Sequence, residues 1–151
     1  CSRRRLRRQV PRTPRPAVLD RMARSARNFR GVRAAGAYDD AFKRGLEALA
    51  ERGLVFDRWH HPQNGKVDPE ELSKLAALAR EFTTAIFVLD HLGGALGPAM
   101  LEDADLFARW KAGIEELAAC PNVFCKVGGL HMSINGWGLE KRERPVGSDE
   151  L

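Results

Sequence analysis

Apolar residues recur along this chain with two spacings, one typical of amphipathic helices and the other of short buried strands. From Ala17 onwards the two patterns alternate. The helical spacing covers residues 19–26, 42–49, 72–82 and 107–117. The short apolar runs cover residues 28–33, 54–59, 85–89 and 122–127. The pattern therefore predicts a helix, then strand and helix three times, then a final strand.

Local signals at helix ends support this assignment. Asp68 suits an N-cap position, and it is followed by Pro69 in the first turn and by Glu71 three positions on. Gly53 follows an earlier helical stretch and is typical of the left-handed residue that ends a helix. Helices are thus predicted to begin near Asp68 and to end before Gly53.

The order of elements favours an α/β fold with a parallel sheet. The four predicted strands start near residues 28, 54, 85 and 122, so their starts are 26, 31 and 37 residues apart. A (β/α)₈ barrel averages about 31 residues per unit. A complete doubly wound sheet is the competing architecture, but no GxGxxG or P-loop sequence follows the first strand. We therefore predict a partial TIM (β/α)₈ barrel, with about four parallel strands and intervening helices, over residues 17–151.

The first 16 residues, CSRRRLRRQVPRTPRP, have a different composition. They combine an arginine run with three prolines and offer almost nothing to bury. Such a segment cannot offset its own ordering entropy, so residues 1–16 are predicted to form a disordered basic arm.

Charge is distributed unevenly between this arm and the rest of the chain. Residues 1–37 hold 12 arginines and one acidic residue, whereas residues 38–151 carry a net charge of −6, which together give the overall +5. A folded nucleic-acid-binding surface would need its positive charge on the folded domain, so nucleic acid is not the expected partner. The alternative that stays open is a non-enzymatic α/β scaffold whose arginine-rich arm binds nucleic acid.

Other features of the composition narrow the class of protein. No apolar run approaches the roughly 20 residues that span a bilayer, so no membrane is expected as a partner. Three cysteines without CxxC spacing favour reduced thiols and a cytoplasmic protein. Cys120 and Cys125 are predicted to act as small buried hydrophobic residues.

Polar residues follow each predicted strand, where the working residues of parallel α/β proteins gather. The residues at or just after the strand ends are Arg33, then His60 and His61, then His91, then Lys126 and His131. Three of the four strands thus bring a histidine to the same rim. The imidazole of His91 could ligate a metal ion or stabilise an oxyanion, although a packed structural histidine has the same sequence pattern.

Other candidates are equally open to two interpretations. Arg33 could clamp a substrate carboxylate or pair with a neighbouring acid. Lys126 could make a charge contact with substrate or be an ordinary strand residue. Trp137 could form the wall of a ring-binding pocket or anchor a loop.

Four strings of residues together resemble a known family. They are FRGVR at 29–33, HPQ at 61–63, VLDHLGG at 88–94 and PNVFCKVGGL at 121–130. Their order resembles the amidohydrolase 2 family of TIM-barrel, predicted metal-dependent hydrolases, which includes fuconolactonase-like and pyrone-dicarboxylate lactonase-like enzymes. The similarity covers residues 17–151.

This resemblance implies a reaction and roles for residues. The reaction is attack of water on a lactone, or on a related ester or amide bond, in a small-molecule substrate at the mouth of the barrel. His91 would be the catalytic residue and a metal ligand. The substrate-binding residues would be Arg33, His61, Gln63, Lys126 and Trp137. The cofactor would be a divalent metal ion such as Zn²⁺, or none, since some lactonases of the family are held to act without a metal.

Two motifs of the family have no counterpart in the chain. The His-x-His pair of the first strand and the aspartate of the eighth strand are both missing. The chain is therefore expected to be a fragment that is inactive alone.

Overall fold

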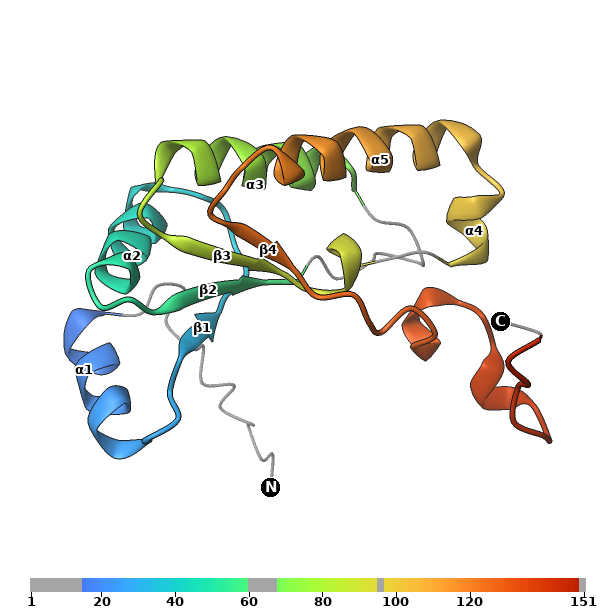
Figure 1. Cartoon of the computed structure of the whole chain (residues 1–151), viewed down its shortest axis with the longest axis horizontal. Coiled ribbons are helices and arrows are strands. Elements are labelled where there is room, and N and C mark those ends of the chain that lie inside the picture. Colours follow the sequence, from blue (N-terminus) through green and yellow to red (C-terminus); the bar gives the residue numbers. More distant parts are fainter. Residues whose placement is uncertain (1–14, 60–67, 95–96, 150–151) are drawn as a thin grey trace, which may run out of the picture.

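The computed structural model describes residues 15–59, 68–94 and 97–149, and it contains four strands that alternate with helices (Figure 1). The strands are β1 (Gly31–Arg33), β2 (Val55–Arg58), β3 (Ile86–Leu89) and β4 (Val123–Cys125). The helices are α1 (Pro16–Ser25), α2 (Asp40–Ala50), α3 (Glu70–Glu81), α4 (Pro98–Leu101) and α5 (Ala104–Ala118). Short 3₁₀ turns cover His91–Gly93, Ser133–Asn135 and Leu139–Lys141.

The four strands form one parallel sheet in the order β1-β2-β3-β4. Each crossover runs through a helix, and α2, α3 and α5 lie on the same side of the sheet (Figure 1). This arrangement is part of an α/β barrel, as the sequence pattern predicts. The first strand is shorter than the predicted 28–33, because residues 28–30 lead into the sheet without pairing along it.

Side chains cap several helices where the sequence provides short polar residues. The Asp39 carboxylate accepts a hydrogen bond from the Phe42 amide at 2.9 Å, and Asp103 accepts one from Leu106 at 2.9 Å. Asp68 accepts from the Glu70 amide at 3.0 Å, which places the beginning of α3 where the sequence predicts it to within two residues. These bonds satisfy amides that a helix leaves unpaired in its first turn.

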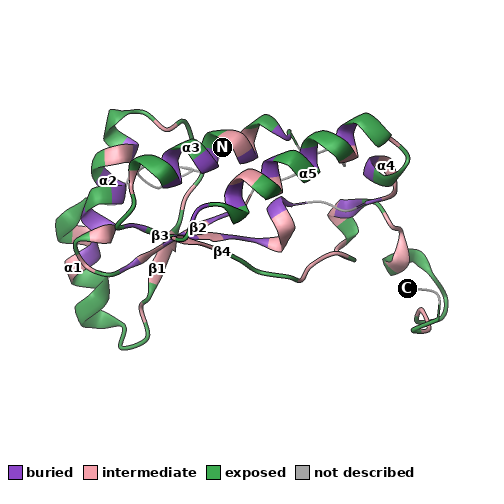
Figure 2. Cartoon of the chain, turned by 45° about the horizontal axis from the view of Figure 1, so that its top comes forward, coloured by how far each residue is buried: buried purple, intermediate pink, exposed green. Residues whose placement is uncertain are grey.

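The core lies between the sheet and its helices (Figure 2). Phe56 and Phe87 on neighbouring strands are almost fully buried, and their rings meet edge to face at 5.9 Å. Phe42 of α2 adds a further edge-to-face contact to Phe56 at 5.3 Å. Leu72 and Leu75 bring the inner side of α3 onto this layer, and both have no exposed surface. Aromatic pairs of this kind contribute beyond the area that they bury.

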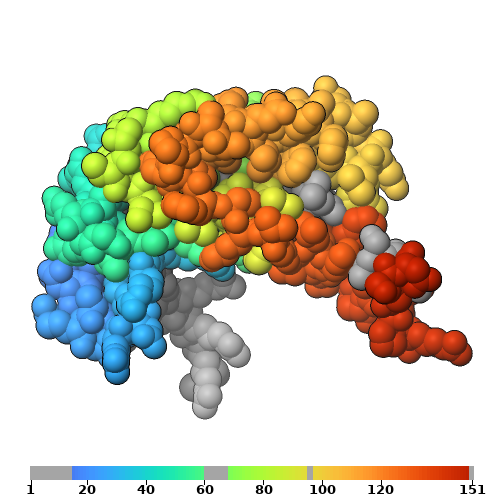
Figure 3. Space-filling view, in the orientation of Figure 1, coloured from blue at the N-terminus to red at the C-terminus, as the bar shows by residue number. Residues whose placement is uncertain are grey.

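The opposite face of the sheet is open in the described part of the chain. Phe124 is 59% exposed and Ile86 is 38% exposed, although both lie on strands. In the space-filling view the molecule is an arch, and its concave side lies beneath the sheet (Figure 3).

The prediction that Cys125 is buried is wrong, because β4 is at the edge of the sheet and leaves this side chain exposed. Cys120, which precedes the strand, is buried as predicted.

None of the helices in the described residues is long and apolar enough to cross a membrane.

Candidate active site

Four charged side chains gather at the carboxyl end of the sheet, one from each strand or from the residue that follows it closely. They are Arg33, Asp57, Asp90 and Lys126, and we call them the charge quartet. The register pairs Arg33 with Asp57, and the period of two along a strand puts Asp90 and Lys126 on the same open face. Parallel strands end at one edge of a sheet, so the fold brings the four together.

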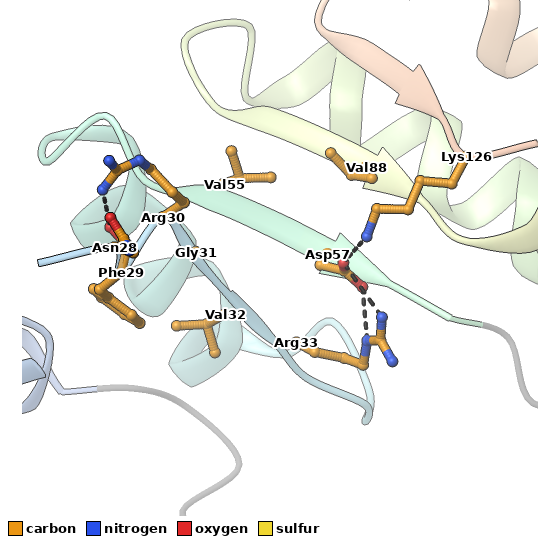
Figure 4. A pocket seen from close by; sticks show the side chains of 10 residues that line it. All are labelled: Asn28, Phe29, Arg30, Gly31, Val32, Arg33, Val55, Asp57, Val88 and Lys126. Carbon is orange, nitrogen blue, oxygen red and sulfur yellow. Dashed lines mark hydrogen bonds and ion pairs between the residues drawn. The ribbon is translucent and has the colours of Figure 1, made fainter. Parts of the chain in front are cut away.

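Cations and anions alternate within the charge quartet. Arg33 Nε lies 2.8 Å from Asp57 Oδ1, and Arg33 Nη2 lies 2.5 Å from Asp90 Oδ2. Lys126 Nζ lies 2.6 Å from Asp57 Oδ2 and 2.8 Å from Asp90 Oδ1. Figure 4 shows Arg33 and Lys126 approaching Asp57 from its two sides. The contacts to Asp90 lack hydrogen-bond geometry, so charge rather than directed hydrogen bonding holds this fully buried carboxylate.

The two aspartates differ in their acidity. Burial raises the pKa of Asp57, but its hydrogen bonds with Arg33 and Lys126 outweigh burial and bring the pKa far below its ordinary value. Burial raises the pKa of Asp90, and the neighbouring Asp57 raises it further. The hydrogen bond with Asp57 and the ion pair with Asp90 raise the pKa of Lys126. Asp57 is therefore the firmly ionised partner of the two cations.

The charge quartet borders an open hollow of about 620 Å³ (Figure 4). Arg33, Asp57 and Lys126 lie at one end, Asn28 and Arg30 lie at the other, and the lining between them is mostly apolar. The apolar lining includes Phe29, Val32, Val55 and Val88. The side chains of Arg33 and Lys126 each keep 51% exposure, so both cations remain accessible from this side. Such a mixture suits a small molecule that carries polar groups as well as an apolar part.

His91 follows Asp90 and lies beside the charge quartet. Its Nδ1 is 3.0 Å from the carbonyl oxygen of Gly128, in the segment after β4. Its ring meets Trp59 edge to face at 5.9 Å, and the Arg33 guanidinium carbon is 6.0 Å from the same Trp59 ring. Three residues singled out in the sequence, Arg33, His91 and Lys126, are thus brought together.

The site roles of the other three candidates stay predictions. His61 and Gln63 lie outside the described residues. Trp137 is in the C-terminal segment, where its ring lies 6.0 Å from that of His131.

Sequence reasoning missed Asp57 and Asp90. Each lies within or directly after an apolar run, where the pattern indicates a strand but no chemistry. The signal that could have found them is the alternation along the strands, because Asp57 shares its face with the register partner Arg33.

The described residues do not by themselves form a metal site. Among residues 15–59, 68–94 and 97–149, no three His, Cys, Asp or Glu side chains are placed to share a metal ion. Asp57 and Asp90 face cations instead, and His91 directs Nδ1 to a carbonyl group. A zinc site generally takes three or four protein ligands, so His91 would supply only one of them.

Comparison with known proteins identifies the family. A family model described as amidohydrolase matches residues 2–148. The chain belongs to this amidohydrolase family.

Two relatives are named for a lactone substrate. An L-fucono-1,5-lactonase from Burkholderia multivorans is 36% identical over 96 residues, which cover 61% of this chain and 29% of the relative. An L-fucono-1,5-lactonase from Burkholderia ambifaria is 30% identical over 126 residues, covering 78% of this chain and 39% of the relative. The chain thus spans less than two fifths of the length of either lactonase.

Solved structures agree with this placement. An amidohydrolase from Burkholderia multivorans with bound Zn is 29% identical, with a TM-score of 0.54, over 72% of this chain and 40% of that one. A crystal structure of an amidohydrolase from the same organism with bound HEPES is 30% identical, with a TM-score of 0.60, over 77% and 42% of the two chains.

Proposed function

We propose that this chain contributes the charge quartet and His91 to the active site of a hydrolase that opens a lactone, or a related ester or amide bond, by attack of water. The observation that carries the proposal is the convergence of Arg33, Lys126 and His91 at the carboxyl end of one parallel sheet. Active sites of α/β barrels lie at this end. The two relatives named as L-fucono-1,5-lactonases support a lactone as the substrate.

His91 is the residue that moves the proton. A neutral imidazole whose Nδ1 donates to a carbonyl group has a free lone pair on Nε2. The oxygen of a water molecule bonds to the substrate carbonyl carbon while one of its protons passes to Nε2. When the carbon–oxygen bond of the ring breaks, the departing oxygen takes that proton, and the product is a hydroxy acid.

Lys126 and Arg33 stabilise the charge that develops on the carbonyl oxygen. Both cations face the hollow, and fixed donors of this kind lower the energy of a tetrahedral oxyanion. Asp57 and Asp90 hold the two cations in place before substrate arrives. The substrate-side roles of His61, Gln63 and Trp137 belong to the same proposal.

A divalent metal ion such as Zn²⁺ is an alternative form of the proposal, in which His91 Nε2 would be the ligand that this chain supplies and could not also accept the proton. The support is the similar amidohydrolase with bound Zn. Because the described residues provide no complete ligand set, the remaining ligands of such a metal ion would lie outside them.

The test uses proton release from aldonolactones, with L-fucono-1,5-lactone first, measured with a pH indicator above spontaneous hydrolysis. We expect the 151-residue chain alone to be inactive, since it spans only part of its relatives. A chimera in which this chain replaces the matching segment of the Burkholderia multivorans lactonase is expected to turn over. His91→Asn in that chimera is expected to lower kcat by about 10²–10⁴-fold. A folded chimera without turnover, or one indifferent to His91→Asn, would overturn the proposal.

A further inference from the structure

The backbone after β3 turns through four successive residues with positive φ. The values are 52° at His91, 55° at Leu92, 83° at Gly93 and 103° at Gly94. Glycine adopts such angles readily, whereas residues with a Cβ adopt them uncommonly. His91 and Leu92 are the only described non-glycine residues with positive φ, so the strain is concentrated at the candidate active site.

Neighbouring elements hold this turn in place. The Leu92 amide donates to the Lys126 carbonyl at 3.3 Å, and the Trp110 indole donates to the Leu92 carbonyl at 3.0 Å. The Gly93 amide closes the turn on the Asp90 carbonyl at 3.0 Å. The turn is therefore fastened to β4 and to α5, and it presents the His91 ring to the segment that follows β4.

That segment determines which ring nitrogen of His91 carries the proton. A carbonyl oxygen only accepts hydrogen bonds, so the 3.0 Å contact with Gly128 requires His91 Nδ1 to donate. In the neutral ring Nε2 is then the unprotonated nitrogen. None of the hydrogen bonds among the described residues involves Nε2, which leaves it available to substrate or water.

Gly129 makes this position of the ring sterically possible. A Cβ at residue 129 would lie 2.5 Å from His91 Nδ1 and 2.9 Å from its Cγ and Cε1. Gly129 also has a φ of 67°. Gly128 offers a contrast, because a Cβ there would meet nothing within 4 Å and its φ lies outside the left-handed range.

We infer that Gly129 is a positioning residue for His91, because only glycine there lets the Gly128 carbonyl hold the ring in its Nδ1–H tautomer with Nε2 free to accept a proton. The value of this tautomer for catalysis rests on the proposed function. The tautomer itself is a property of the chain without substrate, so it is measured independently.

The first measurement is the ¹⁵N spectrum of the histidine rings in the full 151-residue chain at mildly alkaline pH. His91→Asn identifies its signals. We expect Nδ1 to show the shift of a protonated nitrogen and Nε2 that of an unprotonated one. The reverse pattern, or an average of the two tautomers, would overturn the inference without any further variant.

The second measurement compares three glycine variants. Gly129→Ala is expected to displace the ring and to lose the Nδ1–H pattern, whereas Gly128→Ala is expected to keep it. Gly53→Ala controls for backbone strain, since Gly53 has a φ of 60° but a Cβ there would meet nothing within 4 Å. A folded Gly129→Ala chain with an unchanged His91 spectrum would contradict the role of Gly129. If Gly129→Ala does not fold while Gly53→Ala does, the clash of the new Cβ with the His91 ring, rather than backbone strain, prevents folding. That result supports the close approach of residue 129 to the ring, and the wild-type spectrum then decides the tautomer.

Kinetics in the lactonase chimera separate this inference from the proposed function. If the chimera turns over, Gly129→Ala is expected to lower kcat by at least tenfold with little change in KM, because it misplaces a proton carrier rather than a binding group. If the chimera is inactive but the wild-type His91 spectrum is as expected, the proposed reaction fails and the assignment of Gly129 stands.

Discussion

At the scale of single residues, the two aspartates of the charge quartet should give opposite dependences of stability on pH. The pKa of Asp57 is lowered on folding, so its stabilisation is complete above the unfolded value, about 3.9, and is lost as pH falls through and below it. The pKa of Asp90 is raised, so its contribution is complete below that value and is lost as pH rises through the folded pKa. We expect Asp57→Asn to reduce the loss of stability that occurs as pH falls below about 3.9. We expect Asp90→Asn to reduce the loss of stability that occurs as pH rises above about 3.9.

Urea unfolding of both variants from about pH 2 to pH 7 tests these signs. Asp57→Asn should also lower the free energy of unfolding at pH 7 by about 1–2 kcal/mol, a modest value because Arg33 and Lys126 are half exposed. Profiles that change in the same direction for both variants would contradict the assigned shifts.

Part of the candidate site could be predicted from the sequence at this scale. Arg33, His91 and Lys126 could be found because each comes at the end of an apolar run, where parallel strands deliver polar groups. Asp57 was missed because it lies within the apolar run of β2, and alternation places it beside Arg33 only when the register between β1 and β2 is known. The Gly128 carbonyl and Gly129 could not be assigned either, since their contact with His91 joins segments 37 residues apart.

At the scale of elements, the close approach of α3 and α5 gives a prediction with a definite sign. A Cβ added to Gly113 of α5 would lie 2.7 Å from the Cβ of the fully buried Leu72 of α3. In an open helix Gly→Ala stabilises by about 1 kcal/mol. Here overpacking outweighs propensity, and we expect Gly113→Ala to lower the free energy of unfolding by about 1–3 kcal/mol.

Chemical denaturation with matched m-values measures this change. Lys111→Ala, at an exposed position of the same helix, serves as the control and should stay within about 0.5 kcal/mol of the wild type. A stabilised Gly113→Ala variant would show that the two helices can separate at little cost.

The long amphipathic helices were also the elements that sequence predicted best. The 3.6-residue period of Leu72, Leu75 and Ala79 specifies a buried stripe without knowledge of the partner. The four-residue α4 was missed, because a single turn shows no period. The extent of β1 was overestimated, because where a strand begins to pair depends on its neighbour β2 rather than on its own residues.

At the scale of the whole molecule, the number of strands and their parallel order followed from the alternation of patterns, but the state of the open sheet face did not. Val55 and Val88 of the face away from the helices are only half-buried, and Phe124 and Ile86 are exposed. Both outer strands also leave backbone groups without a partner strand in the described part of the chain. This combination favours association between chains and weak cooperativity of unfolding.

Phe124→Gln tests this expectation, because the residue is 59% exposed and contributes little to the core. We expect the wild-type chain to bind an apolar dye and to self-associate as its concentration rises in sedimentation velocity. Phe124→Gln should reduce both effects while changing the free energy of unfolding by no more than about 0.5 kcal/mol.

Leu101→Gln is the matched control, since Leu101 is 53% exposed but lies on α4, away from the sheet. Equal effects of the two variants would mean that exposed apolar area in general, rather than the open face, drives association. A wild-type chain that stays monomeric and unfolds in one sharp thermal transition would show that the half-open sheet is stable by itself.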